Sequence, residues 1–170
     1  MNIPSCITNA MIKSPIDNDY FYGASKMWER LSHIRDGSVN YLDIDMAMLA
    51  NYVECLYKGF LLASGANVSE HVMKESHSLL RLTEEIETKI CPLQHNLSRS
   101  DERDRRNFLI DLSEKYITCR YCNEQICFED FCKCYDWAKA QKEMIYSMLV
   151  PKKEYEQGSE NSYFKANIDY

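Results

Sequence analysis

Two charged side chains interrupt the apolar stretch at residues 43–65, and their types and spacing suggest a site. Glu54 precedes Lys58 by four residues, which places the acid one helical turn before the base, the favourable order for an ion pair. Around them, apolar residues recur at steps of three and four: Leu49, Val53, Leu56, Phe60 and Ala63. Charged groups on so apolar a helix must be paired or must face a groove. The alternative is an ordinary surface pair, which contributes only about 0.3–0.5 kcal/mol.

Further polar and aromatic residues could complete this site: His77, Tyr116, Arg120 and Tyr121. Arg120 follows Tyr116 by one helical turn, so a guanidinium fork for phosphate would lie beside a ring on which a base can stack. Each residue also has a structural interpretation. His77 could be a helix-start residue satisfied by backbone groups. Arg120 could bond the last carbonyls of its helix, or pair with Glu54 inside the bundle and fix the helix register. If the chain binds an anion, we predict that these residues and the charged pair bind it.

Four cysteines form a second candidate site, with the spacing C-x2-C-x4-C-x4-C: Cys119, Cys122, Cys127 and Cys132. This spacing matches a zinc knuckle that has cysteine in the usual histidine place. However, Cys119 falls on the apolar face of one predicted helix, Cys132 lies inside the next, and the segment lacks the glycines of a tight knuckle. We therefore predict that most of these cysteines are small buried thiols, and we expect no metal or other cofactor. A small zinc-dependent nucleic-acid-binding protein is kept as an alternative.

Composition excludes several classes of protein. The 170 residues are 45% hydrophobic, which is typical of a globular domain, and 26 acidic against 20 basic residues give a net charge of −6. That balance argues against a nonspecific phosphate binder, which is normally basic. No stretch of about 18 apolar residues exists, so we expect no membrane span. The N-terminus lacks the apolar core of a secretory signal, and eight cysteines without such a signal predict reduced thiols in the cytoplasm.

The apolar periodicity predicts an all-α fold. Scarce glycine (5) and proline (4) favour long helices over a turn-rich β-fold. We expect helices over residues 19–36, 43–65, 67–90, 98–119 and 131–149. Together they predict an antiparallel up-and-down helical bundle of four main helices plus a shorter one. Residues 1–18 would be an irregular lead-in, 19–150 the bundle, and 151–170 a polar tail that is either disordered or docked on a partner.

Three motifs on this pattern resemble HEPN domains (higher eukaryotes and prokaryotes nucleotide-binding). The second-helix signature of that family is similar to ANYVECLYKGFLLASG, with Glu54 and Lys58 in its charged positions. Its third helix begins with His-Asp-Leu, which is similar to HSLLRLTEEI from His77, with Ser78 replacing the acid. Its next helix ends in Tyr-Ile-x-x-Arg-Tyr-Pro, which matches LSEKYITCRYC except for Cys122 in the proline position. The matching positions of this last motif are Tyr116, Ile117, Arg120 and Tyr121.

The resemblance covers residues 19–149 and implies an all-α bundle, often a homodimer. HEPN proteins include ribonuclease toxins of toxin–antitoxin pairs, partners of minimal nucleotidyltransferases, and noncatalytic nucleotide- or RNA-associated modules. The nucleases carry Arg, four to six residues, then His on a late helix, whereas no histidine follows Arg106 here and Asp111 stands at that spacing. A carboxylate cannot replace the imidazole proton donor near neutral pH. We therefore predict a noncatalytic module that binds nucleotide or RNA, or partners a nucleotidyltransferase; a ribonuclease rearranged around Arg106 and Asp111 is the alternative.

Overall fold

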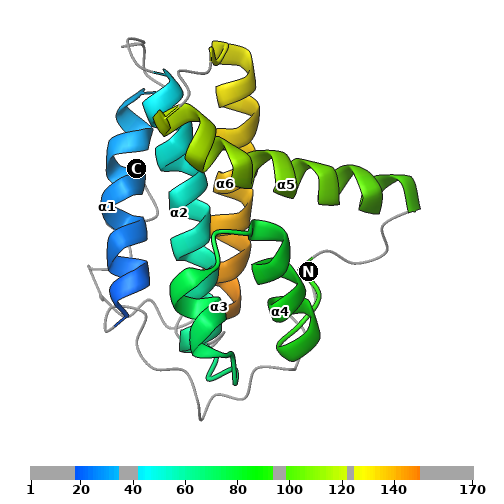
Figure 1. Ribbon diagram of the computed structural model, residues 1–170. Helices are drawn as coiled ribbons and strands as arrows, with labels where there is room; N and C mark the ends of the chain where they lie inside the picture. Colours follow the sequence, from blue (N-terminus) through cyan, green and yellow to red (C-terminus); the bar gives the residue numbers. More distant parts are fainter. Residues whose placement is uncertain (1–17, 35–41, 94–98, 122–124, 150–170) are drawn as a thin grey trace.

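The computed structural model of the chain describes residues 18–34, 42–93, 99–121 and 125–149, and the parts described are helical with no strand (Figure 1). In chain order the helices are α1 (Asp19–Ile34), α2 (Leu42–Ala63), α3 (Glu70–Glu75), α4 (Leu79–Lys89), α5 (Arg99–Tyr121) and α6 (Phe128–Leu149). The predicted all-α helical bundle is therefore confirmed. Of the predicted lead-in at 1–18, only Asn18 is described, and the predicted tail at 151–170 lies outside the described residues.

Helix α2 is the centre of the bundle. It packs against α1, α4, α5 and α6, and it is buried around most of its circumference. This follows from its sequence, because a helix that is apolar on nearly every side must be covered on every side. Gly65 ends the segment with φ 70°, and Ala66 donates a backbone hydrogen bond of 3.2 Å to the Leu61 carbonyl. A glycine in this left-handed conformation closes the helix without the steric cost that a side chain would add.

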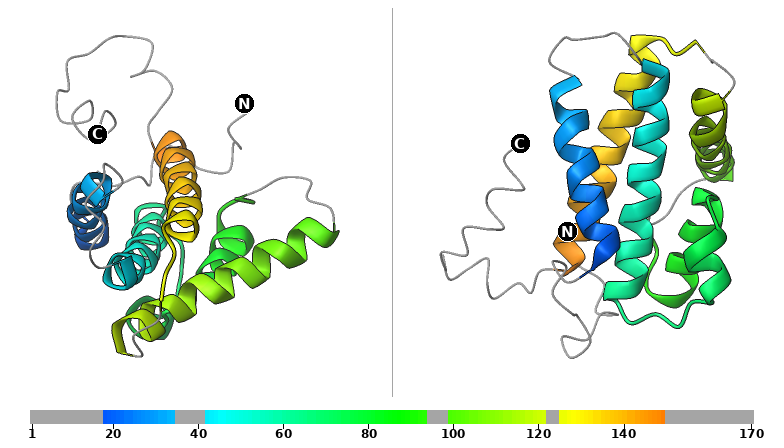
Figure 2. Two further views of the ribbon diagram at one scale, coloured as in Figure 1. Left: turned by 90° about the horizontal axis from the view of Figure 1, so that it is seen from above. Right: turned by 60° about the vertical axis from the view of Figure 1, so that its left-hand side comes forward.

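The other helices are arranged around α2 in two directions. Helices α1, α2 and α6 run side by side, and α5 lies at a steep angle to them, with its C-terminal end against α2 and its N-terminal turns projecting away from these three helices (Figures 1 and 2). The sequence of α5 explains this orientation, because its buried side chains are few and none of them lies in its first ten residues: Leu109, Leu112 and Cys119. A helix with so short an apolar stripe contacts the bundle over part of its length only.

The region predicted as one helix over residues 67–90 is divided into α3 and α4. Ser69 caps α3 by accepting a hydrogen bond from the Val72 backbone N–H, and Ser78 caps α4 by accepting one from the Arg81 N–H, each at 3.3 Å. Serine is a strong N-cap residue, since its hydroxyl satisfies an N–H that has no partner inside the helix. The second cap interrupts the helix at residues 76–78 and leaves His77 outside both helices.

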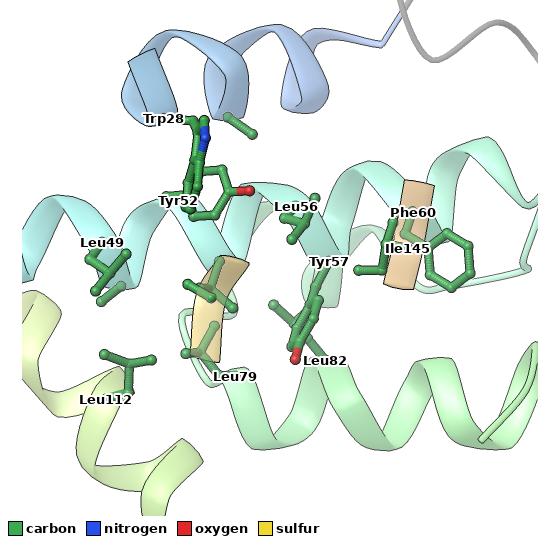
Figure 3. Packing of buried hydrophobic residues seen from close by; sticks show 14 of the residues in the cluster. Trp28, Leu49, Tyr52, Leu56, Tyr57, Phe60, Leu79, Leu82, Leu112 and Ile145 are labelled. Carbon is green, nitrogen blue, oxygen red and sulfur yellow. The ribbon is translucent and has the colours of Figure 1, made fainter. Parts of the chain in front are cut away.

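An apolar core fills the space between α2 and its neighbours, and Figure 3 shows part of it. Trp28 of α1 lies against Tyr52 of α2 and stacks on Tyr135 of α6, with ring centroids 4.8 Å apart in both pairs. On the opposite side of α2, Leu79 and Leu82 of α4 are fully buried. This second layer supports the segment that carries His77.

Candidate functional site

The two charged residues that interrupt the apolar sequence of α2, Glu54 and Lys58, form a buried ion pair. Lys58 Nζ lies 2.7 Å from Glu54 Oε1, and the two side chains are 3% and 8% exposed. Tyr20 of α1 helps to enclose them, with its ring centroid 5.9 Å from Lys58 Nζ and its hydroxyl donating to the Met73 carbonyl at 3.0 Å. The pair is therefore not an ordinary solvent-exposed pair on the helix surface. A charge buried this deeply must be compensated by a partner of opposite charge.

His77 joins the buried pair to the surface. Its Nδ1 lies 2.9 Å from Glu54 Oε2, so the carboxylate bridges Lys58 and His77. The imidazole side chain is 49% exposed. Because a carboxylate only accepts hydrogen bonds, Nδ1 carries the proton, and in the neutral ring Nε2 keeps its lone pair. The buried pair therefore sets both the orientation and the tautomer of a half-exposed histidine.

Helix α5 adds aromatic and cationic groups to this histidine. The Tyr116 ring stacks on the His77 ring, with centroids 5.1 Å apart and planes at 21°. Arg120 Nη1 donates a hydrogen bond of 2.7 Å to the Tyr116 hydroxyl. The Arg120 guanidinium lies 5.0 Å from the Tyr116 ring centroid and 5.4 Å from that of Tyr121. Arg120 and Tyr121 are exposed, so the outer end of the group faces solvent.

All six predicted ligand-binding residues thus form one connected group, which we call the His77 cluster: Glu54, Lys58, His77, Tyr116, Arg120 and Tyr121. They come from α2, the segment before α4, and the end of α5. A hydrogen bond of 2.9 Å from the Leu79 backbone N–H to Ser113 Oγ ties the start of α4 to α5. This contact holds Tyr116, one turn beyond Ser113, over His77.

Two sequence-based expectations about the cluster need correction. The proposed Glu54–Arg120 pair is wrong, because Glu54 pairs with Lys58 and His77 while Arg120 bonds Tyr116 on the exposed side of α5. Lys58, expected to offer a point charge to a ligand, is only 3% exposed and is held by Glu54. The groups open to solvent are His77, Arg120 and Tyr121.

Sequence reasoning missed the residues that support the cluster. Tyr20 covers Lys58, and the buried Asn18 donates from Nδ2 to the Gly59 carbonyl at 2.9 Å, which anchors the start of α1 on α2. Asn18 Oδ1 also accepts from the Tyr20 backbone N–H at 3.0 Å, which caps the start of α1. Their contacts with α2 and α3 bridge segments that are distant in sequence, so no local pattern reveals them.

The alternative catalytic residues do not converge. Arg106 pairs with Glu84 of α4 at 2.9 Å, and Asp111 is exposed on α5. Five residues along a helix correspond to roughly 140° of rotation, so the two side chains leave α5 on different sides. The neighbouring Arg105 is a structural contact, bound to Glu87 through Nη1 at 2.8 Å and Nη2 at 3.1 Å.

The predicted cysteine set is spread over different environments. Cys119 is buried in α5, Cys132 is half-buried in α6, and Cys122 lies outside the described residues. Cys127 is exposed, and its Sγ accepts from the Asp130 backbone N–H at 3.4 Å at the start of α6. Within the described ranges, no group of three or more His, Cys, Asp or Glu side chains is placed to hold a metal ion.

Among the helices that the structure describes, none combines the length and the apolar character needed to cross a bilayer. No family model, no curated protein and no solved structure matches this chain. The resemblance to HEPN domains therefore rests on the three sequence motifs alone.

Proposed function

We propose that this chain is a noncatalytic HEPN-type module that binds a nucleotide or a short stretch of RNA through the exposed side of the His77 cluster. The observation that supports this most directly is the environment of Arg120. Its guanidinium is exposed, lies beside the rings of Tyr116 and Tyr121, and is oriented by a hydrogen bond to the Tyr116 hydroxyl. Such a guanidinium offers a planar fork to phosphate.

The neighbouring groups suit the rest of a nucleotide. Tyr121 is 72% exposed, and a base stacked on its ring would gain about 1–3 kcal/mol. His77 offers a ring nitrogen to a ribose or base, and the buried Glu54 carboxylate holds that ring in place. Groups that are already oriented lose little conformational entropy when a ligand binds, which favours affinity.

Titration calorimetry with nucleotides and short single-stranded RNA tests the proposal. We expect binding to the wild type and none to Arg120→Ala, with unchanged helix content because Arg120 is exposed. Arg106→Ala is the matched control, since it removes another exposed, hydrogen-bonded arginine from the same helix. Absence of heat with the wild type would rule out the proposed site, and equal loss in both variants would indicate a nonspecific charge effect.

We also infer where the protein is located in the cell and which partners it binds. We expect a cytoplasmic protein whose cysteines are reduced. We also expect a homodimer, or a complex with a minimal nucleotidyltransferase. Two exposed apolar side chains on α5, Ile110 and Ile117, lie seven residues apart on one side of the helix and support an association of this kind. Light scattering that gives a monomer mass at tens of micromolar protein, roughly the range where weak dimers form, would contradict the homodimer.

A further inference from the structure

The carboxylate on His77 Nδ1 has a chemical consequence beyond holding the ring in place for a ligand. We infer that His77 Nε2 is a phosphoryl-acceptor site, able to take a phosphoryl group from a small phosphoramidate or acyl phosphate. The inference rests on the Glu54–His77 contact of 2.9 Å, the burial of Glu54, and the exposure of the imidazole. It does not depend on nucleotide binding, because such donors contain no nucleoside.

The Glu54 carboxylate activates the ring from its far side. A carboxylate that accepts the Nδ1 proton raises the electron density at Nε2 and stabilises the imidazolium that forms when Nε2 reacts. Lys58 fixes the position of the carboxylate through its 2.7 Å contact with Oε1, and Oε2 is left to bond His77. Because the Glu54 side chain is only 8% exposed, water cannot easily replace His77 at this oxygen.

The same chain contains a matched comparison. His71 also places Nδ1 near a carboxylate, 2.7 Å from Glu75 Oε2, but these side chains are 64% and 69% exposed. An exposed pair on one short helix is screened by water and salt and loses the contact readily. His71 therefore has the same pair of functional groups as His77 without the buried, immobilised carboxylate. If Glu54 activates His77, the two histidines must differ in reactivity.

With phosphoramidate as donor, every atom and charge is accounted for. The Nε2 lone pair attacks phosphorus, the Nε2–P bond forms, and the P–N bond of the protonated donor breaks to release ammonia. The ring becomes a phosphorylated imidazolium that keeps its Nδ1 proton, and the Glu54 carboxylate offsets the new positive charge. Arg120, on the neighbouring Tyr116, adds a positive field that favours the dianionic phosphoryl group.

The experiment treats the full chain with potassium phosphoramidate and follows each histidine by mass spectrometry at alkaline pH, where phosphohistidine is stable. We expect His77 to be phosphorylated at least about tenfold faster than His71 or the exposed His33. Phosphorus NMR should assign the product to Nε2. This comparison lies within the wild-type protein, so it needs no variant to fold. Equal or faster reaction at His71, or a product on Nδ1 of His77, would overturn the inference.

A variant tests the role of the buried carboxylate. Glu54→Gln combined with Lys58→Met removes both charges together and leaves no unpaired buried ion. We expect phosphorylation of His77 in this variant to slow to the rate of His71, which stays unaltered as the internal standard. Circular dichroism would show that the helices are retained. An undiminished rate at His77 in the folded variant would show that Glu54 does not activate the ring.

Discussion

Two tyrosines of α2 bury their hydroxyl groups in different ways. Tyr57 donates a hydrogen bond of 3.0 Å to Gln141 Oε1 on α6. The Tyr52 hydroxyl is buried with no hydrogen-bond partner in the described part of the chain, although its ring packs against Trp28 (Figure 3). A buried hydroxyl that makes no hydrogen bond costs about 1–3 kcal/mol. The ring of Tyr52 therefore stabilises the fold, whereas its hydroxyl opposes it.

This difference predicts opposite effects of the same substitution. Tyr52→Phe removes only the unpaired hydroxyl, so the free energy of unfolding should rise by about 1 kcal/mol. Tyr57→Phe leaves Gln141 Oε1 without its donor, so that free energy should fall by about 1–2 kcal/mol. Urea denaturation measures both. A loss of stability of similar size in both variants would show that the Tyr52 hydroxyl has a partner.

At the scale of helices, the close approach of α1 and α2 depends on Gly59. A Cβ atom at this position would lie 2.9 Å from Phe21 Cδ1, and Phe21 is only 2% exposed. A Cβ at Gly23 of α1 would meet nothing within 4 Å. One glycine is therefore required by packing and the other is not.

Alanine scanning of these glycines should separate packing from helix propensity. Gly59→Ala forces a buried ring to move and should lower the free energy of unfolding by about 1–3 kcal/mol. Gly23→Ala meets no obstacle and should raise it by about 0.5–1 kcal/mol, because alanine favours the helix. Thermal denaturation of the two variants checks both signs. Stabilisation by Gly59→Ala would mean that Phe21 has room to move.

Arginines on α5 allow a second test at this scale. The Arg105 side chain is 12% exposed and bonds Glu87 of α4 and Glu102 of its own helix, whereas Arg106 is 46% exposed in its pair with Glu84. Partial burial alone would lower the pKa of Arg105, but the hydrogen bonds that its guanidinium donates to the Glu87 and Glu102 carboxylates outweigh burial and raise the pKa. Arg105 is therefore a firm link between α4 and the projecting half of α5.

We expect Arg105→Ala to lower the free energy of unfolding by about 1.5–3 kcal/mol, the range for hydrogen bonds to charged groups. Arg106→Ala should change it by less than about 1 kcal/mol, as usual for an exposed pair. Hydrogen exchange should also show faster exchange in the first half of α5 for Arg105→Ala only. Equal effects in the two variants would contradict the assigned role of burial.

For the whole molecule, buried acids predict loss of stability at alkaline pH. Burial raises the pKa of the Cys55 and Cys134 thiols from 9.0 to about 11, and it also raises the pKa of Tyr52 and Tyr57 above 10.0. The folded state binds these protons more tightly than the unfolded chain does. Their contribution to the free energy of unfolding is therefore complete below pH 9, and it is lost as the pH rises toward 11.

Lys142 has the opposite effect, since burial lowers its pKa from 10.5 to about 8. Its contribution to the free energy of unfolding is complete above pH 10.5 and is lost as the pH falls toward 8. Because several acids oppose this single base, we expect the Tm to fall above pH 9. Thermal denaturation between pH 7 and 11 would measure the Tm at each pH. The double variant Cys55→Ala, Cys134→Ala should show a weaker dependence of the Tm on pH. A Tm that rises over this interval would contradict the assignment.

The local pattern of apolar residues determined the helices and the central position of α2. Steps of three and four place apolar groups around that helix, and Gly65 ends it, whatever surrounds it. The division of residues 67–90 into α3 and α4 was harder to predict from the sequence. The apolar period continues through this region, and it competes with the helix caps at Ser69 and Ser78. A cap is a local signal, but its outcome depends on the packing of both neighbouring helices.

The residues of the His77 cluster could be named from sequence motifs, whereas their contacts could not. An acid and a base four residues apart have the same spacing on a solvated helix as on a buried one. Tyr20 of α1 and His77, which are distant in sequence, help to enclose Glu54 and Lys58. Likewise, Tyr116 meets His77 because α5 crosses the bundle at that point. Helix formation depends on neighbours along the chain, but burial and pairing depend on segments brought together by folding, so only the tertiary structure decided them.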